Sequence, residues 1–113
     1  MELVKRAAEA GTVYREVPFA VNVDGTILEG LIDLAFDDGT GLTIVDYKTD
    51  DVPEQHLAEH AKSYRLQVGA YALAAREVFG KAPKAAALLF LRAGREIPVE
   101  IGGPLLDSVR RQL

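Results

Sequence analysis

The feature that most constrains the fold is a short apolar run, AAALLFLR, that follows a long helical segment. The run covers residues 85–92 and lacks polar–apolar alternation, which is typical of a strand buried on both faces. An earlier apolar run, residues 42–45, ends in Asp46-Tyr47-Lys48. A strand, a crossover helix and a second buried strand predict parallel pairing with a right-handed connection. The chain is therefore expected to be an α/β sheet with helices packed on it.

The first half of the chain is predicted to form three antiparallel strands. Residues 14–23 contain Pro18, which favours the edge of a sheet because proline has no backbone N–H to donate. Asp24-Gly25 is a strong hairpin signal before the next strand, residues 26–36. A second turn then leads into the strand that carries VDYK. Residues 14–49 are thus expected to be a three-stranded meander.

Three segments are predicted to be helical. Residues 1–11 are interpreted as the remnant of an upstream helix that Gly11 ends. Residues 53–79 are expected to be the crossover helix, with proline in the first turn and glycine directly after the last one. Residues 85–101 would hold the later strands, and residues 104–113 a last helix. The predicted order is α-βββ-α-β(β)-α, with a mixed central sheet, in one domain spanning residues 1–113.

Composition limits the classes of protein that need to be considered. A chain of 113 residues suits one domain, and it carries a formal charge of −4. This charge argues against a protein that coats nucleic acid, but not against a nuclease, because a metal site concentrates acids. Without cysteine there is no disulfide, thiol nucleophile or iron–sulfur cluster. No signal peptide or membrane span is expected, so the predicted location is the bacterial cytoplasm, with work at the nucleoid.

Turn positions allow the acids of the meander to be aligned. Pairing outward from the turn at residues 39–40 joins Asp33 with Asp46, and pairing outward from Asp24-Gly25 joins Glu16 with Asp33. Asp46 and Lys48 lie two residues apart and therefore share one face of their strand. Like charges placed opposite each other destabilise a sheet unless a cation compensates them. The row predicts a site for Mg²⁺ or Mn²⁺, with Lys48 beside it.

The alternative interpretation is that these acids are solvated residues at strand ends. A shift of one residue in either turn would send an acid to the opposite face of the sheet. Convergence of three acids and one lysine from two independent turns favours the site.

These residues resemble a known family. The pattern REVPF…LEGLIDLAF…GLTIVDYKTD…YRLQVGAY is similar to the nuclease domain of AddA- and RecB-type helicase–nucleases, in the PD-(D/E)XK superfamily with its restriction-endonuclease-like core. The resemblance covers roughly residues 13–75. REVPF and DYKTD together are closer to AddA than to the superfamily at large.

The resemblance implies a role for each matching position. Asp33 and Asp46 would be metal ligands, together with the backbone carbonyl of Tyr47, and Lys48 would be the catalytic lysine. Glu16 matches the acid at the margin of the site. The family's Q-xxx-Y helix element corresponds to Gln67 and Tyr71, with Tyr64 a further candidate for the same face. Their spacing agrees with this, since residues four apart share a helix face.

The resemblance also implies a reaction and partners. The expected activity is metal-dependent hydrolysis of DNA, as an exonuclease on single-stranded ends delivered by a helicase during double-strand-break repair and recombination. Parent helicase domains and an AddB-like second subunit would be the protein partners.

One feature of the family has no match here. The family carries a histidine metal ligand on a helix well upstream of REVPF, and neither histidine of this chain precedes Glu16. The chain is therefore interpreted as a truncated C-terminal piece of a larger helicase. The alternative function is a catalytically silent DNA-binding or docking module of the same fold.

A competing motif is the sequence HLAEH, which satisfies H-x-x-E-H of inverted zinc peptidases. His56 and His60 would then share one helix face. Zinc chemistry would need a third ligand and a larger scaffold. A solvated helix start is the preferred interpretation.

Overall fold

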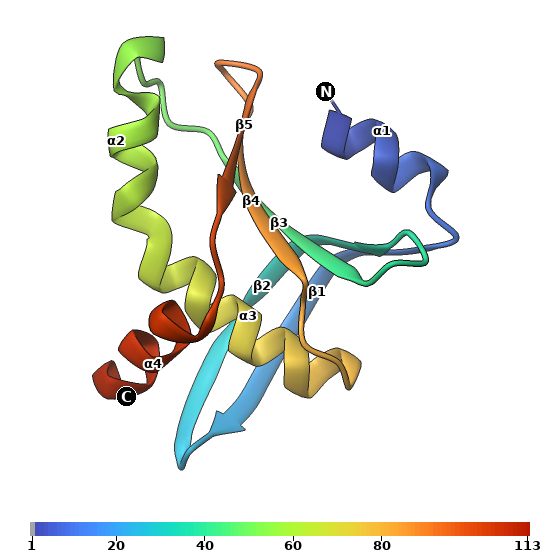
Figure 1. Cartoon of the computed structure of the whole chain (residues 1–113), viewed down its shortest axis with the longest axis vertical. Coiled ribbons are helices and arrows are strands. Elements are labelled where there is room, and N and C mark those ends of the chain that lie inside the picture. Colours follow the sequence, from blue (N-terminus) through green and yellow to red (C-terminus); the bar gives the residue numbers. More distant parts are fainter. Residues whose placement is uncertain (1) are drawn as a thin grey trace.

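The computed structural model describes residues 2–113, so Met1 of the predicted first helix lies outside the described residues. Its helices and strands follow the order in Figure 1: α1 (Glu2–Glu9), β1 (Thr12–Val23), β2 (Thr26–Asp37), β3 (Leu42–Lys48), α2 (Leu57–Ala61), α3 (Arg65–Phe79), β4 (Ala85–Phe90), β5 (Arg95–Val99) and α4 (Gly103–Gln112). Two short 3₁₀ turns, η1 (Glu54–His56) and η2 (Lys62–Tyr64), flank α2. None of the described helices is long and apolar enough to cross a membrane.

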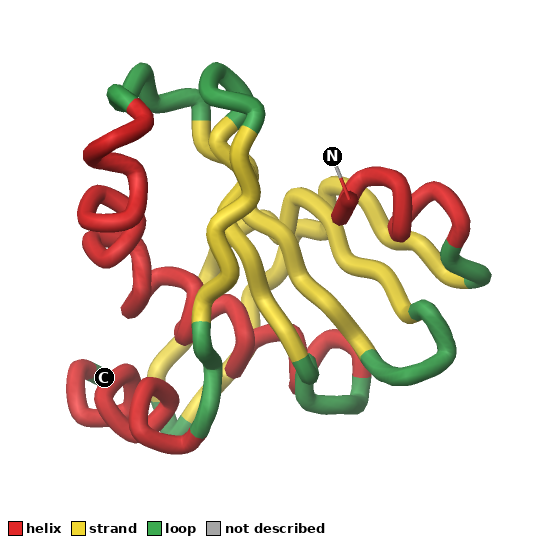
Figure 2. The backbone as a smooth tube through the Cα atoms, turned by 45° about the horizontal axis from the view of Figure 1, so that its top comes forward, coloured by secondary structure: helices red, strands yellow, loops and turns green. Residues whose placement is uncertain are grey.

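The strands form one five-stranded sheet in the order β1-β2-β3-β4-β5. Strands β3 and β4 are parallel, and every other neighbouring pair is antiparallel. Helices α2, α3 and α4 lie on one side of the sheet and α1 on the other (Figure 2). The predicted α/β class and mixed sheet are confirmed, and β1, which contains Pro18, is an edge strand.

The crossover segment differs from the prediction of one helix over residues 53–79. It is divided into η1, α2, η2 and α3. Backbone angles at the two junctions leave the regular helix, with φ −108° and ψ −2° at His56 and φ −100° and ψ 1° at Tyr64. No glycine or proline lies between the two junctions, so the break has no local sequence signal. Packing decides it, because the divided path buries Leu57 and Ala61 against the sheet.

Two hydrophobic cores lie on the two faces of the sheet. The larger one contains Ile44 and Phe90 beneath α3, and the smaller one contains Phe36 and Val45 beneath α1. Phe36 and Phe90 are fully buried, one in each core. Strand β4 contributes to both, as expected for a strand covered on both faces.

The two N-terminal strands are kinked near Glu16. Val13 and Val17 are an even number of residues apart, so a regular strand would place them on one face. Val17 instead packs against the core beneath α3, and Val13 against the core beneath α1. Ile32 and Leu34 of β2 are divided between the cores in the same way. Glu16 has φ 50°, a left-handed backbone that is uncommon outside glycine, and this accounts for the change of face in β1.

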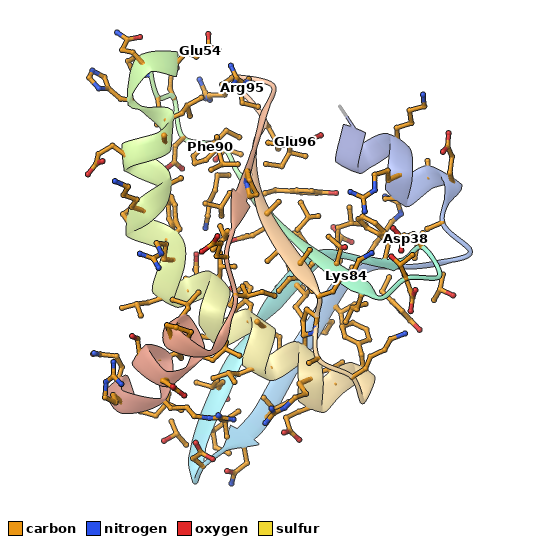
Figure 3. All side chains as sticks on the ribbon, viewed as in Figure 1. Asp38, Glu54, Lys84, Phe90, Arg95 and Glu96 are labelled. Carbon is orange, nitrogen blue, oxygen red and sulfur yellow. The ribbon has the colours of Figure 1, made fainter. Side chains whose placement is uncertain are left out.

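Ion pairs join the sheet to neighbouring segments (Figure 3). Asp38, in the turn after β2, pairs with Lys84 and with Arg6 of α1, each at 3.1 Å. Glu54 of η1 pairs with Arg95 at the start of β5. These pairs are largely exposed, so each is expected to contribute little to stability.

Gly69 allows α3 and α4 to approach each other closely. A Cβ atom there would lie 2.7 Å from Cγ2 of Val109 and 3.1 Å from Cγ of Leu105. We expect Gly69→Ala to lower the free energy of unfolding by about 1 kcal/mol, because overpacking outweighs the roughly 1 kcal/mol gained in helix propensity. Urea denaturation measures this change.

The double variant Gly69→Ala/Val109→Ala is the control for this effect. Shortening Val109 makes room for the new methyl group, so the two losses are expected to sum to more than the loss in the double variant. A Gly69→Ala protein more stable than the wild type would contradict the predicted close contact.

Candidate active site

Strand β3 presents Asp46 and Lys48 at its C-terminal end. Alternation along the strand puts them on the face of Leu42 and Ile44, which is the face that α3 covers. Lys48 Nζ lies 3.0 Å from Asp46 Oδ2, and both side chains are mostly buried, at 14% and 12% exposure. The acid and the base at the end of VDYK therefore form a desolvated ion pair.

Asp33 reaches this pair from β2. The register runs through Phe36–Thr43 and Leu34–Val45, as predicted from the turn, and the ladder ends there. Beyond it, the backbone N–H of Tyr47 donates to Asp33 Oδ2 at 2.8 Å. The carboxyl group of Asp33 also interacts with that of Asp46. The sheet therefore opens at the point where the two acids meet.

The pKa of Asp46 is raised to about 6. Burial is the largest cause, the adjacent carboxyl group of Asp33 adds to it, and Lys48 acts in the opposite direction. Asp46 Oδ2 is buried without a hydrogen-bond partner, since the ammonium group is close to it but not in hydrogen-bonding geometry. One lysine does not fully compensate the two acids, so the site favours additional positive charge.

Helix α3 and the turn before it supply the polar and aromatic side chains around the ion pair. Gln67 Oε1 accepts a hydrogen bond from Lys48 Nζ at 2.8 Å. The same ammonium group lies 4.1 Å from the centre of the Tyr64 ring, in a cation–π contact. Lys48 is therefore contacted from β3, from α3 and from η2.

Tyr71 lies one helical turn after Gln67 and faces the two acids. Burial raises its pKa, and the negative charges of Asp46 and Asp33 raise it further. Its ring packs edge-on against Phe19, with centroids 5.4 Å apart. Gly30 makes room for both rings, because a Cβ atom there would lie 2.9 Å from Phe19 and 3.2 Å from Tyr71.

Glu16 is not brought to the two aspartates. It lies at the position opposite Asp33, between the pairs Arg15–Leu34 and Val17–Ile32, but its side chain is exposed and its backbone is left-handed. Within residues 2–113, no group of three acids, histidines or cysteines converges on a metal position. The kink therefore leaves a pair of acids instead of the predicted row of three.

The two histidines of HLAEH lie in different helical segments. His56 ends η1 and is exposed, whereas His60 belongs to α2. His60 Nε2 lies 2.6 Å from Asp50 Oδ2, and Tyr64 Oη donates to the same oxygen at 2.5 Å. Asp50, the last residue of VDYKTD, was not among the predicted site residues. Its position two residues beyond Lys48, on the same side of the alternation, was the available signal.

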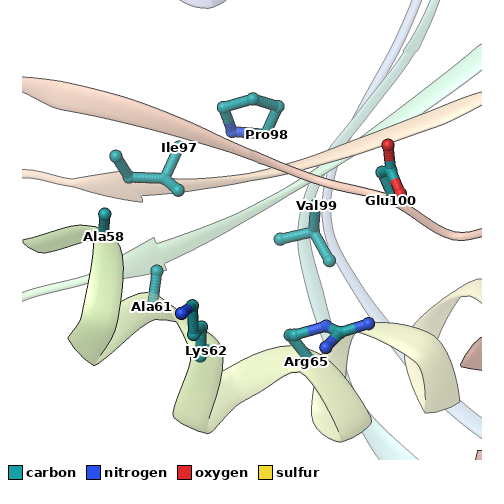
Figure 4. Close-up of a pocket in the computed structure, with 8 residues that line it drawn as sticks. All are labelled: Ala58, Ala61, Lys62, Arg65, Ile97, Pro98, Val99 and Glu100. Carbon is teal, nitrogen blue, oxygen red and sulfur yellow. The ribbon is translucent and has the colours of Figure 1, made fainter.

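A groove of about 370 Å³ lies between α2, η2 and β5 (Figure 4). Its lining includes Lys62, Arg65, Ile97 and Glu100. No candidate site residue lines it, so the groove is separate from the pair of acids.

The fold and the site together define a class: a nuclease with two carboxylates and a lysine at the open end of a mixed sheet. The chain belongs to the PD-(D/E)XK nuclease superfamily, because the model of that family matches residues 1–108. The resemblance drawn from the sequence is confirmed, and so is the restriction-endonuclease-like fold.

The relatives narrow the class further, to the AddA-type ATP-dependent helicase/nucleases. The chain is 33% identical over 110 residues to the protein of this kind from Carboxydothermus hydrogenoformans, a match that covers 86% of the chain. It is 30% identical to the protein of the same name from Clostridium acetobutylicum, over 84% of the chain. The chain spans only 9% of the length of each of these relatives.

Proposed function

We propose that this chain is a metal-dependent deoxyribonuclease domain that hydrolyses DNA phosphodiester bonds. The observation that carries the proposal is the buried pair Asp33 and Asp46 with Lys48 beside it. Two adjacent acids and one base at the opening of a sheet suit a reaction in which negative charge develops on a phosphate. Mg²⁺ is the expected cofactor, with Mn²⁺ as its substitute.

The chemistry of the donors fits a divalent cation. Asp46 Oδ2 is buried and lacks a hydrogen bond, and the raised pKa of Asp46 reflects a carboxylate short of positive charge. Mg²⁺ is commonly held by one or two carboxylates while it keeps several waters, so two acids are sufficient. Asp33 and Asp46 would be the ligands from the side chains.

The backbone carbonyl of Tyr47 is the proposed third ligand. The N–H and C=O of one strand residue point toward the same neighbouring strand. Since the N–H of Tyr47 bonds to Asp33 of β2, its carbonyl is expected to point toward β2 as well. The ladder between β2 and β3 ends at Leu34–Val45, which leaves that side of Tyr47 without a strand partner.

A divalent cation bound there would lower the pKa of a water and polarise the phosphate. Lys48 would hold the attacking water or place its positive charge beside the phosphate oxygen. Gln67 keeps the ammonium group in place, and Tyr71 faces the site from the same helix. Gln67, Tyr71 and Tyr64 are proposed to contact the DNA backbone. Glu16 would act at the margin of the site.

The substrate and the assembly are proposed from the relatives. These ATP-dependent helicase/nuclease proteins are about eleven times as long as the matched segment, which suggests a domain beside a helicase motor. Single-stranded DNA ends delivered by that motor are the proposed substrate, cleaved as an exonuclease. The proposed partners are the parent helicase domains and an AddB-like second subunit. Residues 1–113 would act as one nuclease domain.

The proposal is tested by cleavage of end-labelled single-stranded DNA with Mg²⁺, with Mn²⁺ or with EDTA. Cleavage is expected only with a metal ion, and Asp33→Asn is expected to lower its rate about 100-fold or more, because it removes a direct ligand. Asp107→Asn, an equal change of charge at an exposed position of α4, is the control. Duplex DNA of the same sequence shows whether a single strand is preferred.

Thermal unfolding with and without metal separates the two candidate functions. A bound cation is expected to raise the Tm of the wild type and not that of Asp33→Asn. Metal-dependent stabilisation without cleavage would favour the silent docking module. Equal cleavage by the wild type and Asp33→Asn would refute the proposed site.

A further inference from the structure

We propose that Asp50 is a positioning residue for Lys48, acting through the ring of Tyr64, with His60 holding the carboxylate of Asp50. This inference rests on the proposed function for its effect on cleavage, but its geometry can be tested without cleavage. Asp50 is not part of the proposed metal site, and His60 belongs to the HLAEH motif, to which the proposed nuclease chemistry gives no role.

The first step is the pair of short contacts at Asp50. Its Oδ2 accepts a hydrogen bond from Tyr64 Oη at 2.5 Å and lies 2.6 Å from His60 Nε2. The pKa of Asp50 is lowered, chiefly by Tyr64 and then by His60, and the pKa of Tyr64 is raised, chiefly by Asp50. Asp50 therefore stays ionised and Tyr64 stays a hydrogen-bond donor near neutral pH.

The second step is the contact between Tyr64 and Lys48. The ammonium group lies 4.1 Å from the centre of the ring, and the lysine side chain is only 14% exposed. Cation–π attraction is stronger where water is excluded. A phenol that donates to a carboxylate is polarised toward a more electron-rich ring, which strengthens the attraction. The ring thus fills the side of Lys48 that Asp46 and Gln67 leave open.

The third step is the need for an anchor at Tyr64. Tyr64 lies at the junction of η2 and α3, where the backbone leaves the helical region and no side-chain cap stabilises the turn. The bond to Asp50 ties this junction to the chain directly after β3. Because Lys48 and Asp50 lie on one short stretch of backbone, the distance between the ammonium group and the anchor is set by two residues.

His60 completes the arrangement from α2. Its ring packs edge-on against Tyr64 at 5.6 Å and against the buried Phe90 at 6.2 Å. These contacts hold the imidazole in place, so its nitrogen can direct the second hydrogen bond to Asp50. The break of the crossover helix at Tyr64 is thereby connected to the placement of Lys48.

The geometric test is NMR of the Lys48 ε-methylene group in the metal-free protein. A ring at 4.1 Å should shift its proton resonances upfield, and Tyr64→Leu should abolish that shift. Asp50→Asn is expected to remove most of the shift, because the ring loses its charged anchor. Asp51→Asn, the same change at the exposed neighbouring position, should leave the shift unchanged. Backbone amide spectra confirm that each variant is folded.

The kinetic test is single-turnover cleavage of labelled single-stranded DNA with Mg²⁺. Asp50→Asn and Tyr64→Phe are each expected to lower the rate roughly tenfold, the size of a desolvated cation–π contact, with unchanged DNA affinity. The double variant should be no slower than either single variant, because both act through one contact.

The outcomes distinguish the two proposals. A wild type that does not cleave DNA while Asp50→Asn still loses the Lys48 shift refutes the nuclease function and supports the positioning role. An unchanged Lys48 shift in Asp50→Asn, or additive rate losses in the double variant, overturns the positioning role and leaves the nuclease function standing.

Discussion

Lys48→Met is expected to lower the rate of DNA cleavage by about 10²–10³-fold while metal binding is retained. Methionine keeps much of the apolar stem that packs against Tyr64 but removes the charge beside Asp46. The two acids that would hold the metal are unchanged, so Mg²⁺ should still raise the Tm. Single-turnover cleavage and thermal unfolding of the same preparation measure the two properties.

The control for this prediction is Lys5→Met, which removes the same charge at an exposed position of α1. It should cleave at the rate of the wild type. A Lys48→Met protein that cleaves within about threefold of the wild type would contradict the assignment of Lys48 as the catalytic lysine. Loss of metal-dependent stabilisation would instead show that Lys48 mainly maintains the pair of acids.

Asp46→Asn is expected to abolish cleavage and yet to make the metal-free protein more stable at pH 7. The carboxyl group of Asp46 has a pKa of about 6 in the folded protein, against 3.8 for an unperturbed aspartate. Each unit of difference corresponds to about 1.4 kcal/mol. The gain is therefore expected to be about 1–3 kcal/mol, reduced by the loss of the ion pair with Lys48.

The pH dependence has a definite sign. Between about pH 4 and pH 6 the folded protein holds a proton on Asp46 that the unfolded chain has released, so stability falls as pH rises. The contribution is fully present below the unfolded pKa and is lost once the pH exceeds the folded value. Asp46→Asn should remove this fall, and the difference between the two urea-denaturation profiles isolates it from other groups.

Adding Mg²⁺ at pH 7 provides the control for the Asp46 prediction. A cation that neutralises the two acids should recover stability in the wild type and have no effect in Asp46→Asn. A wild-type stability that is flat between pH 4 and pH 6, without metal, would contradict the burial of an under-compensated acid.

Much of the sheet was predictable because strand patterning and turns are local. The Asp24-Gly25 turn and the period of two led to the observed pairs Val23–Thr26 and Phe36–Thr43. Pro18 predicted an edge strand, and the apolar run of β4 predicted a strand covered on both faces. The convergence of Asp33 on the ion pair of Asp46 and Lys48 followed from that register.

The departures occur where distant contacts override local patterns. The kink at Glu16 moves the third predicted acid away from the site, and no glycine or proline at that position signals it. The crossover helix is divided at His56 and Tyr64, although the residues between them favour a continuous helix. Both changes follow from packing two cores on a strongly twisted sheet.

The sequence by itself determined the register of the strands, and therefore that Asp33, Asp46 and Lys48 would meet. Side-chain period and turn geometry act over a few residues, so neighbouring positions suffice to decide them. Only the tertiary structure decided the surroundings of Lys48. Asp50 and Tyr64 are fourteen residues apart, and their bond forms only because the broken crossover helix lies back across the end of β3.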